Sequence, residues 1–245
     1  MVCPLRRGIA FSITVCIILF TFLSAAWAQE EAPVSSTPEE AIGSFVAALC
    51  ENDLQKALQV CAIEDYAAGY DFVGMVDYMK TFMPLQQMAP SEYGLYAGIN
   101  AISAMYALTN QIKMMIYSFF VPEVGDGKPM YVGGSMDDAK AFATTVDPAK
   151  LKNLKLVRTD PPMQTLLNSE KNVKAFQRWA DIYGADEMTE RIALYELDGK
   201  TYLGGFVLLR YGEEWRIKSL NSNLAGLSVM GTVEETTPAA YASLL

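Results

Sequence analysis

The last third of the chain predicts three consecutive antiparallel strands, and this prediction constrains the fold most. The first strand is ERIALYEL (190–197). It is followed by Asp198-Gly199, a pair with the composition of a tight hairpin turn. KTYLGGFVLLRY (200–211) then predicts a longer strand. A second turn leads into WRIKSL (215–220), so the three segments are expected to pair in sequence order.

The central strand of the three predicts a sheet that is covered on both sides. Tyr202 and Phe206 alternate with Leu203 and Val207, which places apolar side chains on both faces. Gly204-Gly205 in the middle of this strand predicts a bulge that curves the sheet.

The segment from residue 37 to about residue 63 predicts a helical hairpin. Thr37 is typical of an N-cap, Pro38 of a first helical position, and Glu40 of the residue that closes a capping box. Apolar residues recur at helical spacing on both sides of Asn52-Asp53, which interrupts the pattern. Two short helices joined near this pair are therefore expected.

Residues from about 64 to 150 predict a helical insertion rich in methionine. Most methionines of the chain lie between Met75 and Met136, which indicates either an adaptable core or an apolar binding surface. The long apolar segment from Tyr93 to Val121 predicts a buried or amphipathic helix. A membrane span is not expected there, because Asn100 and Lys113 would be costly in lipid.

The first residues have the composition of a signal peptide. Arg6 and Arg7 precede an apolar run, and Ala26-Trp27-Ala28 has the pattern of a cleavage site. We expect cleavage after Ala28, export to the periplasm, the cell envelope or the medium, and no stable membrane span afterwards, because the apolar run is short. The predicted organisation is a signal peptide (1–28), a polar leader (29–36), a single α+β domain (37–226) with the insertion at about 64–150, and a C-terminal tail (227–245).

Charge and composition exclude several classes of function. The net charge is −9, and cleavage would remove two arginines and no acidic residue, so nucleic acid is not expected as a partner. The chain has no histidine, which excludes Ser-His-Asp and Cys-His nucleophiles and most zinc sites. No calcium-loop motif is present either. We therefore expect neither a metal site nor a cofactor.

A capped hairpin, TPEEAIGSFVAALCENDLQKALQVC, followed by an antiparallel sheet whose last strand carries GEEWRIKSL, resembles the nuclear transport factor two-like superfamily. This superfamily shares an α+β cone with the ketosteroid isomerases, and the sequence is also similar to exported bacterial proteins with such domains. The resemblance covers about 37–63 and 151–220. It implies that the N-terminal hairpin and a curved C-terminal sheet form a cone around a pocket.

The resemblance leaves three kinds of function open, because members of the superfamily are enzymes, ligand binders or dimerising modules. We expect an exported noncatalytic binding or interaction module, with a small apolar ligand in the cone or a homodimer as the partner. Aromatic residues predicted to line the pocket are Tyr70, Trp179, Tyr195 and Phe206.

The alternative is an isomerase-like enzyme that works by Asp and Tyr acid-base chemistry on a compact apolar substrate. Its candidate residues lie in EDYAAGYDF and are Asp65, Tyr66, Tyr70 and Asp71. The family's His-Asp dehydratase chemistry is excluded, since histidine is absent. For the noncatalytic function no catalytic residue is expected.

Cys50 and Cys61 pose a separate question of pairing. Export favours a disulfide, because an oxidising compartment permits one. The predicted hairpin argues against it, since at 1.5 Å per residue it would leave the two cysteines roughly 10 Å out of register, beyond the ~7 Å limit between bridged Cα atoms. We favour two buried, slowly reacting thiols, and the disulfide remains the alternative.

Overall fold

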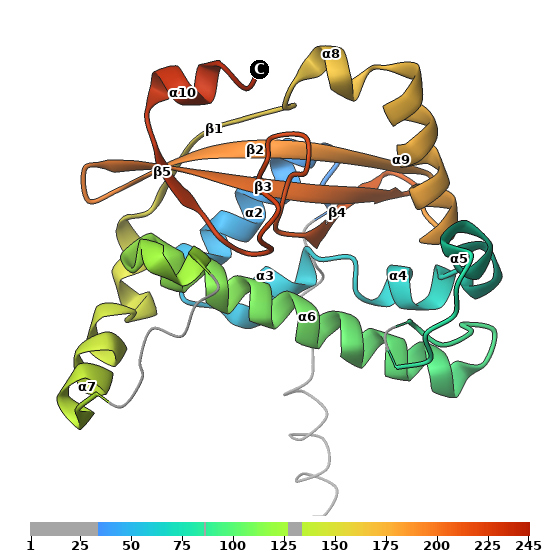
Figure 1. Ribbon diagram of the computed structural model, residues 1–245, viewed down its shortest axis with the longest axis horizontal. Helices are drawn as coiled ribbons and strands as arrows, with labels where there is room; N and C mark the ends of the chain where they lie inside the picture. The colour runs from blue at the N-terminus through green and yellow to red at the C-terminus, as the bar shows by residue number, and fades with distance from the viewer. Residues whose placement is uncertain (1–33, 86, 127–133) are drawn as a thin grey trace, which may run out of the picture. The chain divides into compact units, whose positions relative to one another are not determined.

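The structure, a computed structural model, describes residues 34–85, 87–126 and 134–245 (Figure 1). The predicted signal peptide and residues 29–33 of the predicted leader lie outside these residues. Helices and an antiparallel sheet are both present, which confirms the α+β class. The helices are α2 (Pro38–Cys50), α3 (Leu54–Gln59), α4 (Glu64–Gly69), α5 (Phe72–Met79), α6 (Gly94–Phe120), α7 (Met136–Thr145), α8 (Gln164–Leu167), α9 (Glu170–Ile182) and α10 (Pro238–Ala242), with 3-10 turns η1 (Pro122–Asp126) and η2 (Pro148–Asn153).

The sheet has the order β1-β2-β3-β4, with β5 beside β3. Its strands are β1 (Lys155–Asp160), β2 (Glu187–Leu197), β3 (Lys200–Tyr211), β4 (Glu214–Ser219) and β5 (Glu234–Thr236). Asp198 and Gly199 both have positive φ, at 50° and 80°, as a type I′ hairpin turn requires. The three consecutive strands predicted from the sequence are therefore confirmed.

The irregularities of the sheet lie away from the predicted bulge. Gly204 and Gly205 pair in regular register with Ala193 and Ile192, so the bulge prediction at this pair is wrong. Gly205 is instead needed for close packing, because a Cβ there would lie 2.4 Å from the backbone nitrogen of Ser222. The register between β3 and β4 shifts at Val207/Leu208, and that between β1 and β2 shifts at Leu156/Arg158.

One face of the sheet is packed against helices. Helix α2 contacts β1 and β4, and the C-terminal half of α6 reaches the same core, where Tyr202 donates a hydrogen bond to the carbonyl oxygen of Phe119 at 3.1 Å. The rings of Phe45 and Phe206 meet edge to face with centroids 5.9 Å apart. The sheet is open, and side chains fill this face where the predicted cone would need a pocket.

The other face is partly covered by the last residues of the chain. Leu227 and Tyr241 form a buried cluster with three side chains of β2 and β3 (Ile192, Leu194 and Leu203). Segment 227–245, expected to be a tail beyond the domain, thus supplies β5, α10 and part of the core. No local pattern of this segment indicated the packing, because its partners lie on distant strands.

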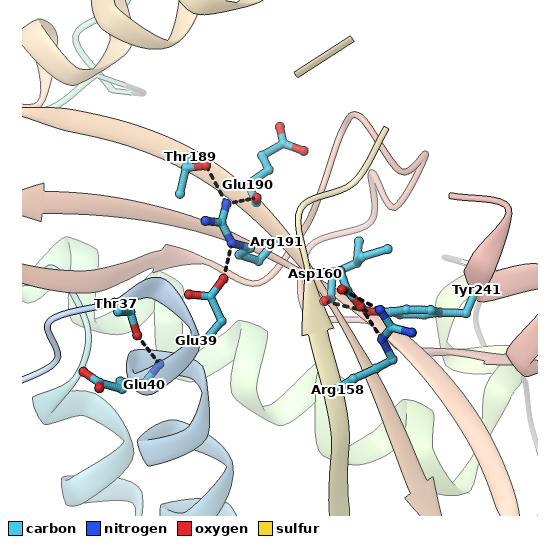
Figure 2. Close-up of polar contacts among 10 residues, drawn as sticks. Thr37, Glu39, Glu40, Arg158, Asp160, Thr189, Glu190, Arg191 and Tyr241 are labelled. Atoms are coloured by element: carbon cyan, nitrogen blue, oxygen red, sulfur yellow. Dashed lines mark hydrogen bonds and ion pairs between the residues drawn. The ribbon is translucent and has the colours of Figure 1, made fainter. Parts of the chain in front are cut away.

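Capping and one ion pair fix the position of α2. Thr37 Oγ1 accepts a hydrogen bond from the backbone N–H of Glu40 at 3.2 Å, as predicted. The Glu40 carboxylate bonds to Ser36 rather than to the backbone of Thr37, so the expected capping box is displaced by one residue. Glu39 accepts from Arg191 Nε at 2.6 Å and so ties the helix to β2 (Figure 2).

Helix α6 runs beside α3 and α4 beneath the sheet (Figure 1). The helix predicted between Tyr93 and Val121 is confirmed. Within the described residues, none of the helices combines the length and the apolar character that crossing a membrane would need.

Candidate functional site

Three of the sequence-predicted site residues gather in one aromatic cluster. The ring of Tyr66 meets those of Tyr70 and Tyr183 edge to face, with centroids 6.2 and 5.0 Å away. Trp179 stacks on Tyr183 at 5.4 Å and meets Tyr78 at 4.8 Å. Burial raises the pKa values of Tyr66 and Tyr183, so both hydroxyls stay neutral at physiological pH. The cluster joins α4, α5 and α9.

The two candidate general bases have structural roles in this arrangement. Asp65 pairs with Arg216 Nε at 3.1 Å, and its side chain is 43% exposed. Asp71 is the N-cap of α5 and accepts from the backbone N–H of Gly74 at 2.8 Å. Neither carboxylate lies in the buried apolar setting that an isomerase base requires.

Tyr195 and Phe206, predicted to line the pocket, lie far inside the core. Both are completely buried, and Tyr195 meets the ring of Phe119 at 5.5 Å. The Tyr195 hydroxyl finds no hydrogen-bond partner among the described residues. Burial holds the pKa of Tyr195 well above its ordinary value. These two side chains fill the sheet face and line neither of the cavities described below.

Cys50 and Cys61 are free thiols in the structure. Cys50 Sγ donates to the carbonyl oxygen of Leu154 at 3.3 Å, and Cys61 Sγ donates to that of Ala57 at 3.2 Å. Burial raises the pKa of Cys61 to about 12, which lowers its thiolate population and its reactivity.

Other polar clusters also serve the fold. The buried carboxylate of Glu190 accepts from Ser222 Oγ at 2.6 Å and from the backbone N–H of Leu224 at 3.0 Å, and so anchors the loop after β4. Asp160 bonds Arg158 and Tyr241 (Figure 2). In the described parts of the chain, cysteine and carboxylate side chains form no group of three or more that could hold a metal ion.

A cavity of about 270 Å³ lies between the helical hairpin, α6 and η2, and we call it the hairpin cavity. Its walls are mostly apolar, and its polar members include Asp53, which caps α3, and Lys113, which donates to Asn110 at 2.9 Å. The lining residues are Leu49, Asn52, Asp53, Leu54, Thr109, Ile112, Lys113, Ile116, Tyr117, Val146, Pro148 and Leu151.

A second cavity, of about 160 Å³, lies between α4, α6 and β4, and we call it the lysine cavity. Lys218 reaches it from β4, with Nζ 5.0 Å from the ring centroid of Tyr66 and 5.2 Å from that of Tyr183. Burial lowers the pKa of Lys218 to about 8. The lining residues are Ala62, Tyr66, Met88, Ser103, Ala104, Ala107, Leu108, Gln111 and Lys218.

Lys218 was not among the residues predicted to form a site, although the sequence of β4 carries a signal for it. Trp215, Ile217 and Ser219 alternate with Arg216 and Lys218 along β4, so the two cations share the opposite face. The sheet was expected to be covered on both faces, and a lysine facing a covered side has to be paired or functional.

Comparisons with known proteins bear on the fold alone. No protein-family model matches the chain, and no curated protein matches its sequence. The crystal structure of a cystatin-like protein from Ruminococcus gnavus is similar, with a TM-score of 0.54 and 21% sequence identity. The match covers 87% of this chain and 44% of that chain, so this chain spans less than half of the protein it resembles.

The resemblance to the nuclear transport factor two-like superfamily is wrong. The similar solved structure is that of a cystatin-like protein, and no family model supports the superfamily. A capped helix followed by antiparallel strands occurs in more than one α+β fold, so the order of elements did not discriminate between them.

Proposed function

We propose that this chain is an exported, noncatalytic binding module that takes a small, largely apolar molecule in the hairpin cavity. The single observation that carries the proposal is the cavity itself, about 270 Å³ with mostly apolar walls. Concave apolar sites with few polar groups are typical of small-molecule binding. Export rests on the composition of the first 28 residues.

Two features of the cavity support binding rather than chemistry. Asp53 uses its carboxylate to cap α3, where it accepts from the backbone N–H of Lys56 at 3.0 Å. Lys113 is exposed and bonded to the Asn110 side chain. A general base or nucleophile that touches a bound molecule would need a free group held toward the cavity, and these two groups are engaged at its rim.

Thermal unfolding with a panel of fatty alcohols and naphthalene derivatives tests this proposal. A ligand at one hundred times its dissociation constant stabilises the folded protein by about 2.7 kcal/mol. At this chain length that corresponds to a rise in Tm of about 5–10 °C. Replacing Ile116 with tryptophan would fill the cavity, so the rise is expected to disappear in Ile116→Trp.

Val173→Trp is the matched control, since Val173 lies on helix α9, is 52% exposed and does not line the cavity. It should keep the full rise in Tm. An unchanged Tm of the unsubstituted chain with every compound, or an equal rise in Ile116→Trp, would contradict binding in the hairpin cavity.

A second candidate function, self-association, is favoured by the exposed apolar side chains of the predicted insertion. We call the following set the Met-rich surface: Val73, Tyr78, Met79, Phe82, Met83, Leu85, Tyr93, Leu95, Tyr96, Ile99, Ile102, Met105 and Tyr106. The C-terminal half of α6 is covered by the sheet, whereas the N-terminal half exposes the members of this set from Leu95 to Tyr106. Exposed apolar surface on this scale is typical of an interaction site.

Analytical ultracentrifugation over a range of concentrations measures this association. We expect a homodimer whose dissociation constant rises at least about tenfold in Tyr106→Glu, because a buried unpaired charge costs more than 1.4 kcal/mol. Val173→Glu, at an exposed position of α9, should leave the constant unchanged. A monomeric mass at every concentration would exclude the homodimer.

A further inference from the structure

Lys218 is placed by a local irregularity of the sheet. Val207 pairs with Ser219 and Leu208 pairs with Ile217, so Lys218 is the extra residue of a bulge in β4. Bulges re-aim side chains and are common next to binding sites. Here the lysine side chain reaches the lysine cavity.

The Lys218 ammonium has no acidic partner among the described residues. The nearby carboxylates of Asp65 and Glu214 both pair with Arg216, the other cation of the strand. The charged interactions of Lys218 within the described residues are with the rings of Tyr66 and Tyr183, over which its Nζ lies. Cation–π contacts of this kind replace only part of the hydration that the ammonium loses.

The charge of Lys218 costs the folded protein stability near neutral pH. Because burial lowers its pKa from 10.5 to about 8, the unfolded chain binds more protons than the folded chain between these values. Stability therefore rises with pH through that window, and the protonated lysine is unfavourable below it. A side chain that costs stability and lacks a partner is typical of a functional site.

We propose that the lysine cavity binds a small carboxylate with a compact apolar body, whose anionic group pairs with the Lys218 ammonium. The body would lie against Ala104, Ala107 and Leu108 of α6, and Met88. A cavity of about 150 Å³ is known to hold benzene, so the volume here suits a single ring. This site is separate from the hairpin cavity and goes beyond the proposed function.

Isothermal titration of the full chain with benzoate at pH 7 tests the proposal. We expect saturable binding with a dissociation constant of about 1 mM or lower. Benzyl alcohol, which has the same ring and no charge, should bind at least tenfold more weakly. Binding should persist in Ile116→Trp, so failure of the hairpin-cavity proposal and failure of this one are distinguishable.

Substitutions of the lysine identify the interaction. Lys218→Met should weaken benzoate binding at least tenfold, and Lys218→Arg should weaken it less because the charge remains. Lys174→Met is the control, since Lys174 is exposed and pairs with Glu170 on α9. The Tm of Lys218→Met at pH 7 should equal or exceed that of the unsubstituted chain, which shows that lost binding is not lost folding.

The pH dependence of binding identifies the titrating group. Benzoate affinity should fall about tenfold between pH 7 and pH 9, as the lysine loses its proton and the benzoate stays ionised. The tyrosines that face Lys218 stay neutral over this range, because burial raises the pKa values of Tyr66, Tyr183 and Tyr211. Arg216 is paired with Asp65. The groups of α6 that line the cavity, Ser103 and Gln111, are neutral.

Three binding results at pH 7 would each overturn the proposal. They are no saturable binding of benzoate, equal affinity for benzoate and benzyl alcohol, and unchanged benzoate affinity in Lys218→Met. Affinity that stays constant from pH 7 to pH 9 would likewise show that the ammonium of Lys218 does not hold the anion.

Discussion

Replacing Phe206 with alanine is expected to lower the free energy of unfolding by about 3–5 kcal/mol. The ring is completely buried at the centre of β3 and meets Phe45 edge to face, so truncation removes its apolar contacts and leaves a cavity. Equilibrium unfolding in urea, monitored by tryptophan fluorescence, measures the loss. A loss of free energy of this size is expected only if side chains pack closely around Phe206 on this face of the sheet.

Tyr195→Phe is the matched control for this prediction. It keeps a ring in the same core cluster and removes a buried hydroxyl that has no partner among the described residues. Its free energy of unfolding should equal or exceed that of the unsubstituted chain, because an unsatisfied buried hydroxyl is unfavourable. A loss below about 1 kcal/mol for Phe206→Ala would indicate that the ring borders an open pocket, as the cone predicted.

Replacing Tyr241 with alanine is expected to lower the free energy of unfolding by about 3–5 kcal/mol as well, although only four residues follow it in the sequence. Its side chain is 1% exposed, and its hydroxyl donates to Asp160 at 2.8 Å and lies 3.2 Å from the carbonyl oxygen of Ile192. Removal would uncover the apolar face of β2 and β3. Urea unfolding again provides the measurement.

Tyr241→Phe separates the hydroxyl from the ring. It should cost about 1–2 kcal/mol, since the bond to a charged acceptor is lost and Arg158 still pairs with Asp160. Changes within about 0.5 kcal/mol for both variants would instead mean that segment 227–245 is only loosely attached.

Acidification should weaken the same contact. Hydrogen bonds from Arg158 and Tyr241 hold the pKa of Asp160 below its ordinary value. The stabilisation by this carboxylate is therefore present above pH ~4, where it would be ionised in the unfolded chain, and is lost as the pH falls through the folded value.

Much of the fold was predictable, because its signals are local. Thr37 caps its helix through a backbone group three residues away, and Asp198-Gly199 turns the chain within a single hairpin. Helical spacing of apolar residues predicted α2 and α3 for the same reason, and the alternation along β3 predicted apolar side chains on both of its faces. In each case the residues that determine the structure are neighbours in the sequence.

The candidate sites were predictable only in part. The sequence identified Tyr66, Tyr70 and Trp179 as aromatic candidates, and the structure brings them together through Tyr183. The sequence alone could not show that Asp65 pairs with Arg216, because the two residues are far apart in the chain. The role of a side chain depends on such long-range partners, which no local pattern encodes.

By itself, the sequence determined the α+β class, the helical hairpin, the consecutive strands and the exclusion of histidine chemistry. Only the tertiary structure decided which apolar faces are filled and which remain open. It placed Phe206 in a closed core, joined the last residues to the sheet and left Lys218 facing a cavity without an acidic partner among the described residues. The physical reason is that secondary structure follows local periodicity and capping, whereas burial and charge pairing depend on contacts between distant segments.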